Sequence, residues 1–227
     1  MTGEIVLYGS TGHALSVREQ IERVFAPRGH RIVAYIDDFA AAGQCVGDVP
    51  VIGFERWRDA FRDVPVIVTI GDPRARRDLV DRIAAAGGKF GSMCGDWPSI
   101  AADFTYGEGS FTGGPNYIGP NVSIGRHVQI QPMTTLAHDA TVGDFTTICT
   151  SNIAGWVLIE AEVFIGVGAA IVNGTRARPI RIGRGAVVYA GAVVTKSVPA
   201  GMRVAGNPAR DISLAARRRR RARDGDS

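Results

Sequence analysis

Apolar residues follow two different patterns along the chain. In residues 4–95, short apolar runs alternate with segments in which apolar residues recur at helical spacing. The runs predict strands at 5–8, 32–36 and 64–70, and the spaced segments predict helices at 14–25 and 73–84. Asp72 and Pro73 are residue types that favour the start of a helix. Strands that alternate with helices predict a small parallel, Rossmann-like α/β sheet.

From about residue 117, an aliphatic residue recurs at every sixth position, apart from one short step between 148 and 153 and a loop at 172–181. The repeating positions are Ile118, Ile124, Ile130, Leu136, Val142, Ile148, Ile153, Ile159, Ile165, Ile171, Ile182, Val188 and Val194. A helix repeats every 3.6 residues and a strand every 2, so neither explains this period. A repeat of six is typical of a parallel β-helix, in which three hexapeptides close one triangular coil and the aliphatic side chains stack inside it.

Charge separates a third segment from these two halves. The formal net charge of +4 arises at residues 217–226, where six arginines outnumber two aspartates, so the rest of the chain is neutral. A neutral body argues against a fold that binds nucleic acid, and a terminal run of charge is typical of a solvated end. We therefore expect an α/β domain at 1–95, a β-helix domain at 96–212 and a basic, disordered tail at 213–227.

Cysteine usage and hydropathy indicate the compartment. The three cysteines, Cys45, Cys94 and Cys149, have neither the number of a disulfide framework nor the spacing of a zinc site. The first residues lack the pattern of a secretory leader, and no apolar stretch approaches the ~20 residues of a membrane span. We expect a soluble, cytoplasmic protein that does not insert into membranes.

Specific motifs lie in both halves of the chain. The first half carries YGSTGHA at residues 8–14, YIDD at 35–38 and GDVPVIG at 47–53. The second half carries AHD at 137–139, VGDF at 142–145, AGAVVTKSVP at 190–199 and GNPA at 206–209. With these motifs, almost the whole chain except the tail resembles the two-domain sugar acetyltransferases of the sialic-acid O-acetyltransferase and bacillosamine-type N-acetyltransferase family.

This resemblance implies a left-handed coil and a homotrimer. It also implies a nucleotide-linked sugar bound to the N-terminal domain and acetyl-CoA, the co-substrate, bound between neighbouring β-helices. The implied reaction is transfer of the acetyl group to the amino group of the sugar, with His138 as general base and Asp139 as the acidic neighbour that orients it. Histidine suits this role because the unperturbed pKa of an imidazole lies near neutrality.

The repeat itself places a glycine beside this histidine. His138 follows the inward Leu136 by two positions, so we expect it on an outer edge of the prism, where it can face a neighbouring subunit. One coil later, allowing for the short step, the chain has Gly155. A glycine at that position leaves room for a thioester, and its N–H is a candidate donor to the oxyanion that develops during acyl transfer.

Further residues are expected to bind the two substrates. Small residues keep the acetyl-CoA groove shallow for backbone amides to reach the pantetheine, while basic and turn residues contact its phosphates and adenine. The expected set is Gly155, Gly166, Gly168, Ala169, Gly191, Lys196, Gly206, Pro208 and Arg210, with the 173–179 loop and its Arg176 and Arg178 as a further candidate.

For the nucleotide sugar, glycines that open a helix bring its N-terminal amides close to a phosphate, and carboxylates accept from ribose hydroxyls or base N–H groups. The expected set is Gly9, Ser10, Thr11, Gly12, His13, Asp37 and Asp38. Without the resemblance, the same residues also fit a NAD site, and the two aspartates also fit an Asx turn.

Thr147 departs from the family pattern, because many relatives carry a second histidine there, nine residues after the base. This departure leaves the acyl group and the acceptor open, including a hydroxyl or a non-sugar amine, and it favours an inactive trimeric scaffold as one alternative. A zinc carbonic anhydrase is another, but three histidine ligands are required and the β-helix offers only His127 and His138, so we expect no metal. Cys149 has no adjacent base and is interpreted as a packing residue.

Overall fold

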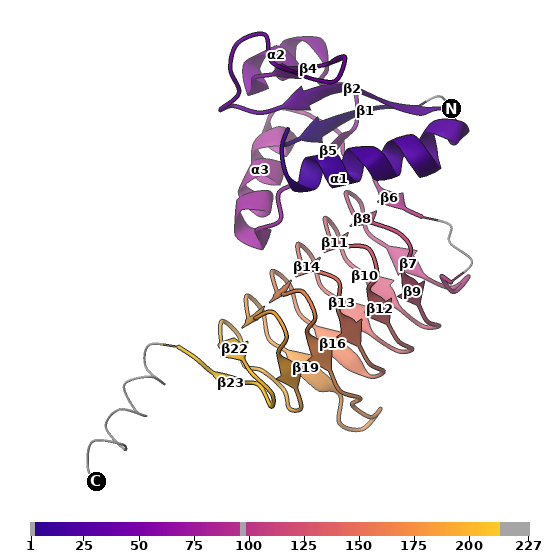
Figure 1. Cartoon of the computed structure of the whole chain (residues 1–227), viewed down its shortest axis with the longest axis vertical. Coiled ribbons are helices and arrows are strands. Elements are labelled where there is room, and N and C mark those ends of the chain that lie inside the picture. Colours follow the sequence, from indigo (N-terminus) through magenta and orange to yellow (C-terminus); the bar gives the residue numbers. More distant parts are fainter. Residues whose placement is uncertain (1–2, 96–98, 214–227) are drawn as a thin grey trace.

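The computed structural model describes residues 3–95 and 99–213. A sheet flanked by helices sits on one side of a long column of stacked coils (Figure 1). The tail predicted at 213–227 lies, apart from Ser213, outside the described residues.

The first part is a five-stranded sheet in the order β3-β4-β2-β1-β5, parallel except for the β3–β4 pair. Its strands are β1 Gly3–Tyr8, β2 His30–Ile36, β3 Cys45–Val46, β4 Val49–Ile52 and β5 Val66–Val68. Its helices are α1 His13–Gln20, which continues through a π-helical turn Ile21–Phe25 and a 3₁₀ turn Ala26–Arg28, then α2 Phe54–Ala60 and α3 Pro73–Ala85. The predicted strands and helices are confirmed, whereas β3, β4 and α2 are too short for their periods to show in the sequence.

The start of α3 follows the sequence prediction. Asp72 Oδ1 accepts hydrogen bonds from the backbone N–H groups of Arg74 and Ala75, at 3.0 and 2.9 Å. Pro73 occupies the first helical position. A backbone N–H at that position has no acceptor within the helix, so proline, which lacks the N–H, loses no hydrogen bond there. This cap sets where α3 begins, and therefore where its first turn meets the coils.

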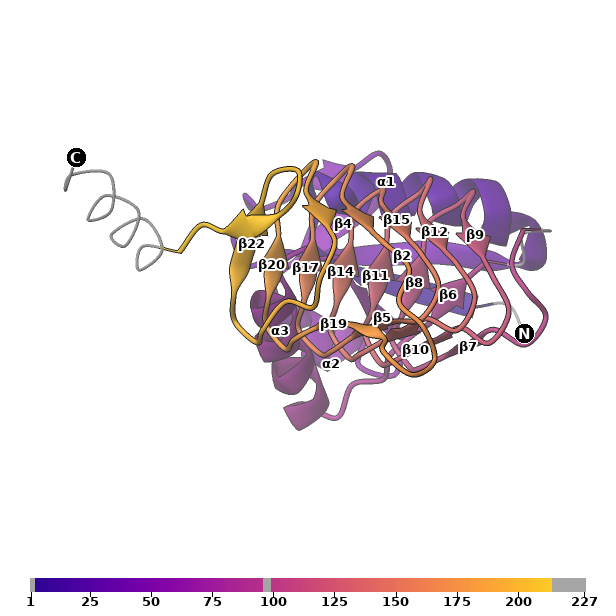
Figure 2. The same ribbon diagram turned by 90° about the horizontal axis from the view of Figure 1, so that it is seen from below.

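The second part is a left-handed parallel β-helix with three faces. Face 1 consists of β7 Thr105–Tyr106, β10 Ser123–Ile124, β13 Thr141–Val142, β16 Val157–Ile159 and β19 Ile180–Ile182. Face 2 consists of β6 Met93–Cys94, β8 Phe111–Thr112, β11 Gln129–Ile130, β14 Thr147–Ile148, β17 Phe164–Ile165, β20 Val187–Val188, β22 Arg203–Ala205 and the antiparallel β23 Arg210–Asp211. Face 3 consists of β9 Tyr117–Ile118, β12 Thr135–Leu136, β15 Asn152–Ile153, β18 Ala170–Ile171 and β21 Val193–Val194. Figure 2 shows the strands of face 2 side by side, one after another along the length of the column.

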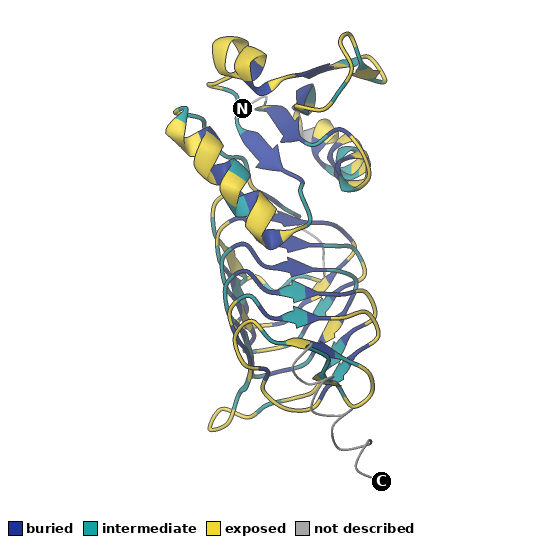
Figure 3. Ribbon diagram, turned by 90° about the vertical axis from the view of Figure 1, so that its left-hand side faces the viewer, coloured by how far each residue is buried: buried dark blue, intermediate teal, exposed yellow. Residues whose placement is uncertain are grey.

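The aliphatic residues of the repeat fill the inside of the column and are buried there (Figure 3). Ile124 lies opposite Val142 in the next coil, which is the regular register. Across the short step Leu136 pairs with Ile153, and across the loop Ile171 pairs with Val194. The missing residue and the inserted loop are both taken up in turns, so the buried column stays continuous.

Face 2 packs against the first domain through Arg76 of α3, whose side chain is only 1% exposed. Its guanidinium donates to the carbonyl oxygens of Ile70, Gly71, His127, Phe145 and Thr146 and to the hydroxyl of Thr147. Burial lowers the pKa of Arg76 to about 9, and the charge of Asp72 offsets part of this effect. One buried cation, bonded mainly to neutral oxygens, therefore joins the two parts of the chain.

Candidate active site

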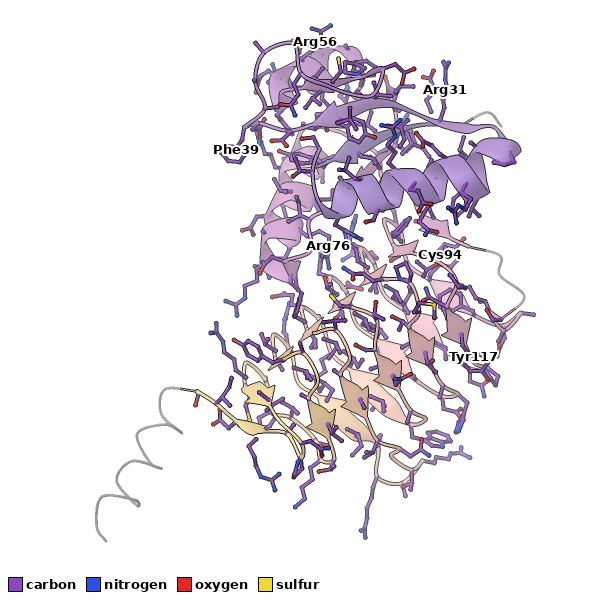
Figure 4. All side chains as sticks on the ribbon, in the orientation of Figure 1. Arg31, Phe39, Arg56, Arg76, Cys94 and Tyr117 are labelled. Atoms are coloured by element: carbon purple, nitrogen blue, oxygen red, sulfur yellow. The ribbon has the colours of Figure 1, made fainter. Side chains whose placement is uncertain are left out.

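A pocket of about 340 Å³ opens at the carboxyl ends of β1 and β2, where ligands bind in open α/β sheets. It is lined by Tyr8, Gly9, Ser10, Thr11, Ile36, Asp37, Asp38, Phe39, Thr69, Ile70, Leu79 and Arg82. Five of these residues belong to the set expected from the sequence. Phe39, which no motif indicated, is 99% exposed and projects from the edge of the domain (Figure 4).

The two aspartates of the pocket are held by groups of their own chain. Asp37 accepts from the Ser10 hydroxyl at 2.5 Å and from the Phe39 N–H at 3.0 Å, and the second bond is the Asx turn that the sequence also allowed. Asp38 accepts from Tyr8 Oη at 2.9 Å and from Arg82.

These contacts set the charge of Asp38. Burial raises its pKa, but hydrogen bonds from Arg82, the Phe54 N–H and Tyr8 outweigh burial and lower the net pKa below the usual value. Asp38 is therefore an ionised acceptor already shared with its neighbours, and its ion pair with Arg82 closes one side of the pocket.

Gly12 and His13 do not line this pocket, contrary to expectation. Gly12 is the residue before α1, with a positive φ of 53° that favours glycine, so its role is in the turn. His13 turns toward the domain junction, where its ring meets Phe111 of β8 edge-on at 6.4 Å between centroids. Burial, followed by the charge of Arg76, lowers the pKa of His13. Its ring packs between the two parts of the chain.

His138 and Asp139 lie at the turn between β12 of face 3 and β13 of face 1, which we call the base corner. The outward position predicted for His138 is confirmed, because 49% of its side chain is exposed. His138 Nδ1 lies 2.7 Å from Asp139 Oδ2. An ionised carboxylate only accepts, so this contact places the ring hydrogen on Nδ1 and leaves Nε2 with a free lone pair. That tautomer is the one a general base requires.

Gly155 stacks on His138 in the next coil, as the repeat predicts. A Cβ at Gly155 would lie 2.5 Å from His138 Cε1 and 2.6 Å from Nε2, so any residue larger than glycine would clash with the ring in this position. The Gly155 N–H, however, already donates to Asn173 Oδ1 at 2.7 Å. The expectation that this N–H is free to bind the oxyanion is therefore not met in the chain as it folds.

The glycines expected to contact CoA lie at a different corner, between face 2 and face 3, which we call the glycine corner. Their amides already donate within the chain: Gly166 to Val188 O, Gly168 to Thr150 O, Ala169 to Gly166 O and Gly191 to Val167 O. Ala169 is also buried inside the column, so its side chain cannot line a groove. These residues can shape a shallow surface, but their backbone N–H groups are not spare donors for pantetheine.

The remaining expected CoA residues are on the surface near the end of the column. Lys196, Gly206, Pro208 and Arg210 are exposed, as are Arg176 and Arg178 in the loop after β18. Face 3 separates the glycine corner from the base corner. Within one chain, the glycines of the first corner therefore do not meet His138 and Asp139.

Thr147 lies on face 2, not at the base corner. It is 1% exposed, donates to Gly71 O at 2.7 Å and accepts from Arg76 at 2.9 Å. The sequence left the acyl group and the acceptor open because of this threonine, and the structure places its side chain away from His138. Its hydroxyl belongs to the domain junction, and the residue gives no support to an inactive scaffold.

His127 is also a junction residue. It is 4% exposed, and its ring stacks on Phe145 at 5.1 Å and meets Phe90 edge-on at 4.7 Å. Burial, with the nearby charges of Arg126 and Arg76, lowers its pKa to about 4. A buried ring at another corner cannot join His138 in the histidine set that a zinc enzyme requires.

Burial raises the pKa of the Cys149 thiol, which agrees with a packing role. Within residues 3–95 and 99–213, no group of three or more histidine, cysteine or carboxylate side chains is arranged to hold a metal. No helix of the same residues is long and apolar enough to cross a membrane.

Known proteins match parts of this chain. Residues 4–83 match the family model of the PglD N-terminal domain. Over 116 residues, 50% of this chain, the sequence is 42% identical to a GDP-perosamine N-acetyltransferase of Escherichia coli O157:H7. That match covers 52% of the relative, so the chain spans about half the length of this curated protein.

Two solved structures cover nearly all of the chain. The acetyltransferase domain of PglB from Neisseria gonorrhoeae FA1090, in complex with acetyl coenzyme A, is 26% identical with a TM-score of 0.80, over 93% of this chain and 100% of that one. PerB from Caulobacter crescentus, in complex with CoA and GDP-perosamine, is 27% identical with a TM-score of 0.79, over 94% and 99%. Both the sheet domain and the coils therefore have counterparts in proteins solved with CoA ligands.

Proposed function

Because the chain belongs to the family of two-domain, hexapeptide-repeat sugar acetyltransferases, we propose that it transfers the acetyl group of acetyl-CoA to the amino group of a nucleotide-linked amino sugar. The contact between His138 Nδ1 and Asp139 Oδ2 carries this proposal, since it leaves a basic nitrogen exposed beside a residue without a side chain. The PerB relative, solved with CoA and GDP-perosamine, supports the class of both substrates.

In this reaction His138 Nε2 takes the proton of the attacking amine. Asp139 holds the ring hydrogen on Nδ1 and stabilises the imidazolium that forms, as the aspartate beside a catalytic histidine does in other acyl transfers. The His138 ring lies directly against Gly155, and the exposed side of the ring is left for the thioester carbon. His138 then returns the proton to the departing thiolate, so the enzyme ends the cycle unchanged.

The nucleotide part of the acceptor is assigned to the pocket of the first domain. Gly9, Ser10 and Thr11 line this pocket just before α1, and the positive end of the helix dipole favours a phosphate there. Phe39 offers an exposed ring for stacking on a base, and Thr11 is exposed at the mouth of the pocket. Arg82 and Asp38 supply a fixed pair of charges at its wall.

The active unit is proposed to be a homotrimer, because one chain does not bring its own pocket to its own base. Face 2 carries the first domain, through Arg76 and through Gln129, which donates to Val68 O. In a triangular coil the base corner is the vertex opposite face 2. The pocket of one chain and His138 of the same chain therefore lie on opposite sides of the β-helix, and a neighbouring subunit must supply one of them. Closed rings are the usual way to satisfy such a heterologous contact.

We expect purified protein to release CoA thiol from acetyl-CoA only when an amino sugar nucleotide is present. The measurement is thiol appearance with GDP-perosamine and with UDP-linked amino sugars as acceptors. The same nucleotides should raise the thermal unfolding midpoint, because a ligand that binds the native state stabilises it. Thiol release at the same rate without any acceptor, or none with any member of the panel, would contradict the proposed activity.

Two inactive variants are expected to restore activity when they share an assembly. His138→Ala removes the base, and Thr11→Trp fills the pocket mouth, so each homotrimer is inactive for a different reason. Every trimer that contains both variants has one interface of three at which an intact pocket meets an intact base, so about a third of the sites combine both. The two proteins are co-expressed with different tags, isolated by both tags and assayed. Activity no higher than that of either variant alone would show that pocket and base belong to one chain.

A further inference from the structure

Asn121 lies at the base corner one coil before Asp139, in the turn between β9 and β10. Its Nδ2 donates to Asp139 Oδ1 at 3.1 Å, the carboxylate oxygen that does not face His138. We propose that Asn121 is a positioning residue of the acetyl-transfer site, which orients Asp139 and, through it, His138. This assignment rests on the proposed function and adds to it a residue that lies outside the sequence motifs.

The two oxygens of Asp139 have different partners. Oδ2 lies 2.7 Å from His138 Nδ1, and Oδ1 accepts from Asn121. An ionised carboxylate only accepts, so the atom of Asn121 that faces it is the amide nitrogen. With Oδ1 held from the preceding coil, the carboxylate is restrained from rotating about its last bond, and Oδ2 stays directed at the ring. The bond from Asn121 therefore fixes how Asp139 meets the imidazole.

The backbone holds both residues of this pair in place. The Asn121 N–H donates to Asp103 Oδ2 at 2.8 Å, one coil earlier, and the Asp139 N–H donates to Pro120 O at 3.0 Å. Asn121 and Asp139 have positive φ angles of 58° and 57°, a conformation that asparagine and aspartate adopt more readily than most residues. The two side chains therefore leave equivalent turns and meet one coil apart.

The partner of Asp139 differs from those of other carboxylates that bridge neighbouring coils through side chains. Among the described residues, each of the others pairs with an arginine: Asp144 with Arg126, Glu160 with Arg181 and Glu162 with Arg184. A guanidinium beside Asp139 would offset the negative charge that stabilises the imidazolium. A carboxamide fixes the carboxylate through a hydrogen bond and carries no charge of its own. The residue type at position 121 therefore suits a carboxylate that must keep its charge for the base.

The orientation of Asp139 decides which ring nitrogen of His138 carries the hydrogen. While Oδ2 faces Nδ1, the hydrogen stays on Nδ1, and Nε2 keeps the lone pair that takes the proton of the amine. Without the bond from Asn121, the carboxylate can turn, and part of the population adopts the other tautomer, with the hydrogen on Nε2. That tautomer cannot accept a proton at Nε2. Asn121 thus raises the fraction of His138 that is ready to act.

The first test is Asn121→Gly in the whole chain, since glycine tolerates the positive φ at this position. We expect kcat for thiol release to fall by about 10-fold, the order expected for one hydrogen bond to a charged group, with the KM of both substrates unchanged. Asn121→Asp, which keeps the size but has no donor, should lose at least as much. Arg126→Ala removes the bridge to Asp144 at a corner without the base and should leave kcat unchanged. Thermal unfolding of each variant checks that the fold is intact.

A double-mutant cycle separates positioning from a contribution to the fold alone. Once Asp139→Asn is in place, adding Asn121→Gly should lower kcat by less than about 2-fold, because Asn121 acts through the carboxylate that has been removed. Two independent contributions would multiply. A further fall of about 10-fold in the double variant would therefore overturn the assignment, as would an unchanged kcat in Asn121→Gly alone.

The ¹⁵N chemical shifts of the His138 ring, measured by NMR, report the tautomer without any turnover. The unmodified protein should carry the hydrogen on Nδ1, and Asn121→Gly should show a mixture of the two tautomers. If the tautomer is the same in both proteins, Asn121 does not orient the base. Because this measurement needs no substrate, it still decides the role of Asn121 if the protein releases no thiol with any acceptor, a result that would remove the proposed function.

Discussion

Replacing His138 by alanine is expected to lower kcat by ~10²–10⁴-fold, the usual contribution of a positioned general base. The reason is geometric, because Nδ1 is bound to Asp139 and Nε2 is left as the basic nitrogen of the ring. The side chain is half exposed, so the fold should not depend on it. Steady-state rates of thiol release, with thermal unfolding of the same sample, measure both effects.

His138→Gln is the matched variant, since glutamine has a similar size and polarity but no basic nitrogen. It should lose as much activity as the alanine variant. Asp139→Asn should lose less than His138→Ala, because the base remains but its tautomer is no longer enforced. Near-normal turnover in both His138 variants would show that the proton is removed by another group or by water.

Arg76→Met is expected to lower the free energy of unfolding by about 3–5 kcal/mol, because several buried carbonyl oxygens lose their donor at about 1–3 kcal/mol each. Methionine is close to arginine in length but cannot donate, so the carbonyl oxygens at the junction of α3 and face 2 would be left buried without a donor. Figure 4 shows this side chain between the helix and the coils. Urea denaturation followed by circular dichroism gives the value.

Arg74→Met on the same helix is the control, because Arg74 is exposed, and it should change the free energy of unfolding by less than about 0.5 kcal/mol. If Arg76→Met is equally mild, the two parts of the chain are held together mainly by apolar contacts. A second transition at low denaturant in the Arg76 variant would instead indicate that the parts separate before they unfold.

The hexapeptide period by itself determines much of the second half of the chain. A stacked column of aliphatic side chains permits one register, because a shift by one residue would turn every inward side chain outward. The positions of Leu136 and Ile153 therefore predict that His138 points outward and that Gly155 stacks on it, even across the short step. In the first half, the cap at Asp72 and the glycines before α1 likewise mark the helix starts and the pocket.

Contacts between segments far apart in the chain were decided by the tertiary structure alone. No local pattern shows that Thr147 and His127 face another domain, that Asn173 reaches the Gly155 N–H, or that Arg82 pairs with Asp38. Each of these depends on where a turn or helix end places a polar group in space, and the period of the sequence does not predict the conformation of the turns. The repeat set the direction of each side chain, whereas packing between segments decided which polar groups were already engaged and which were left for chemistry.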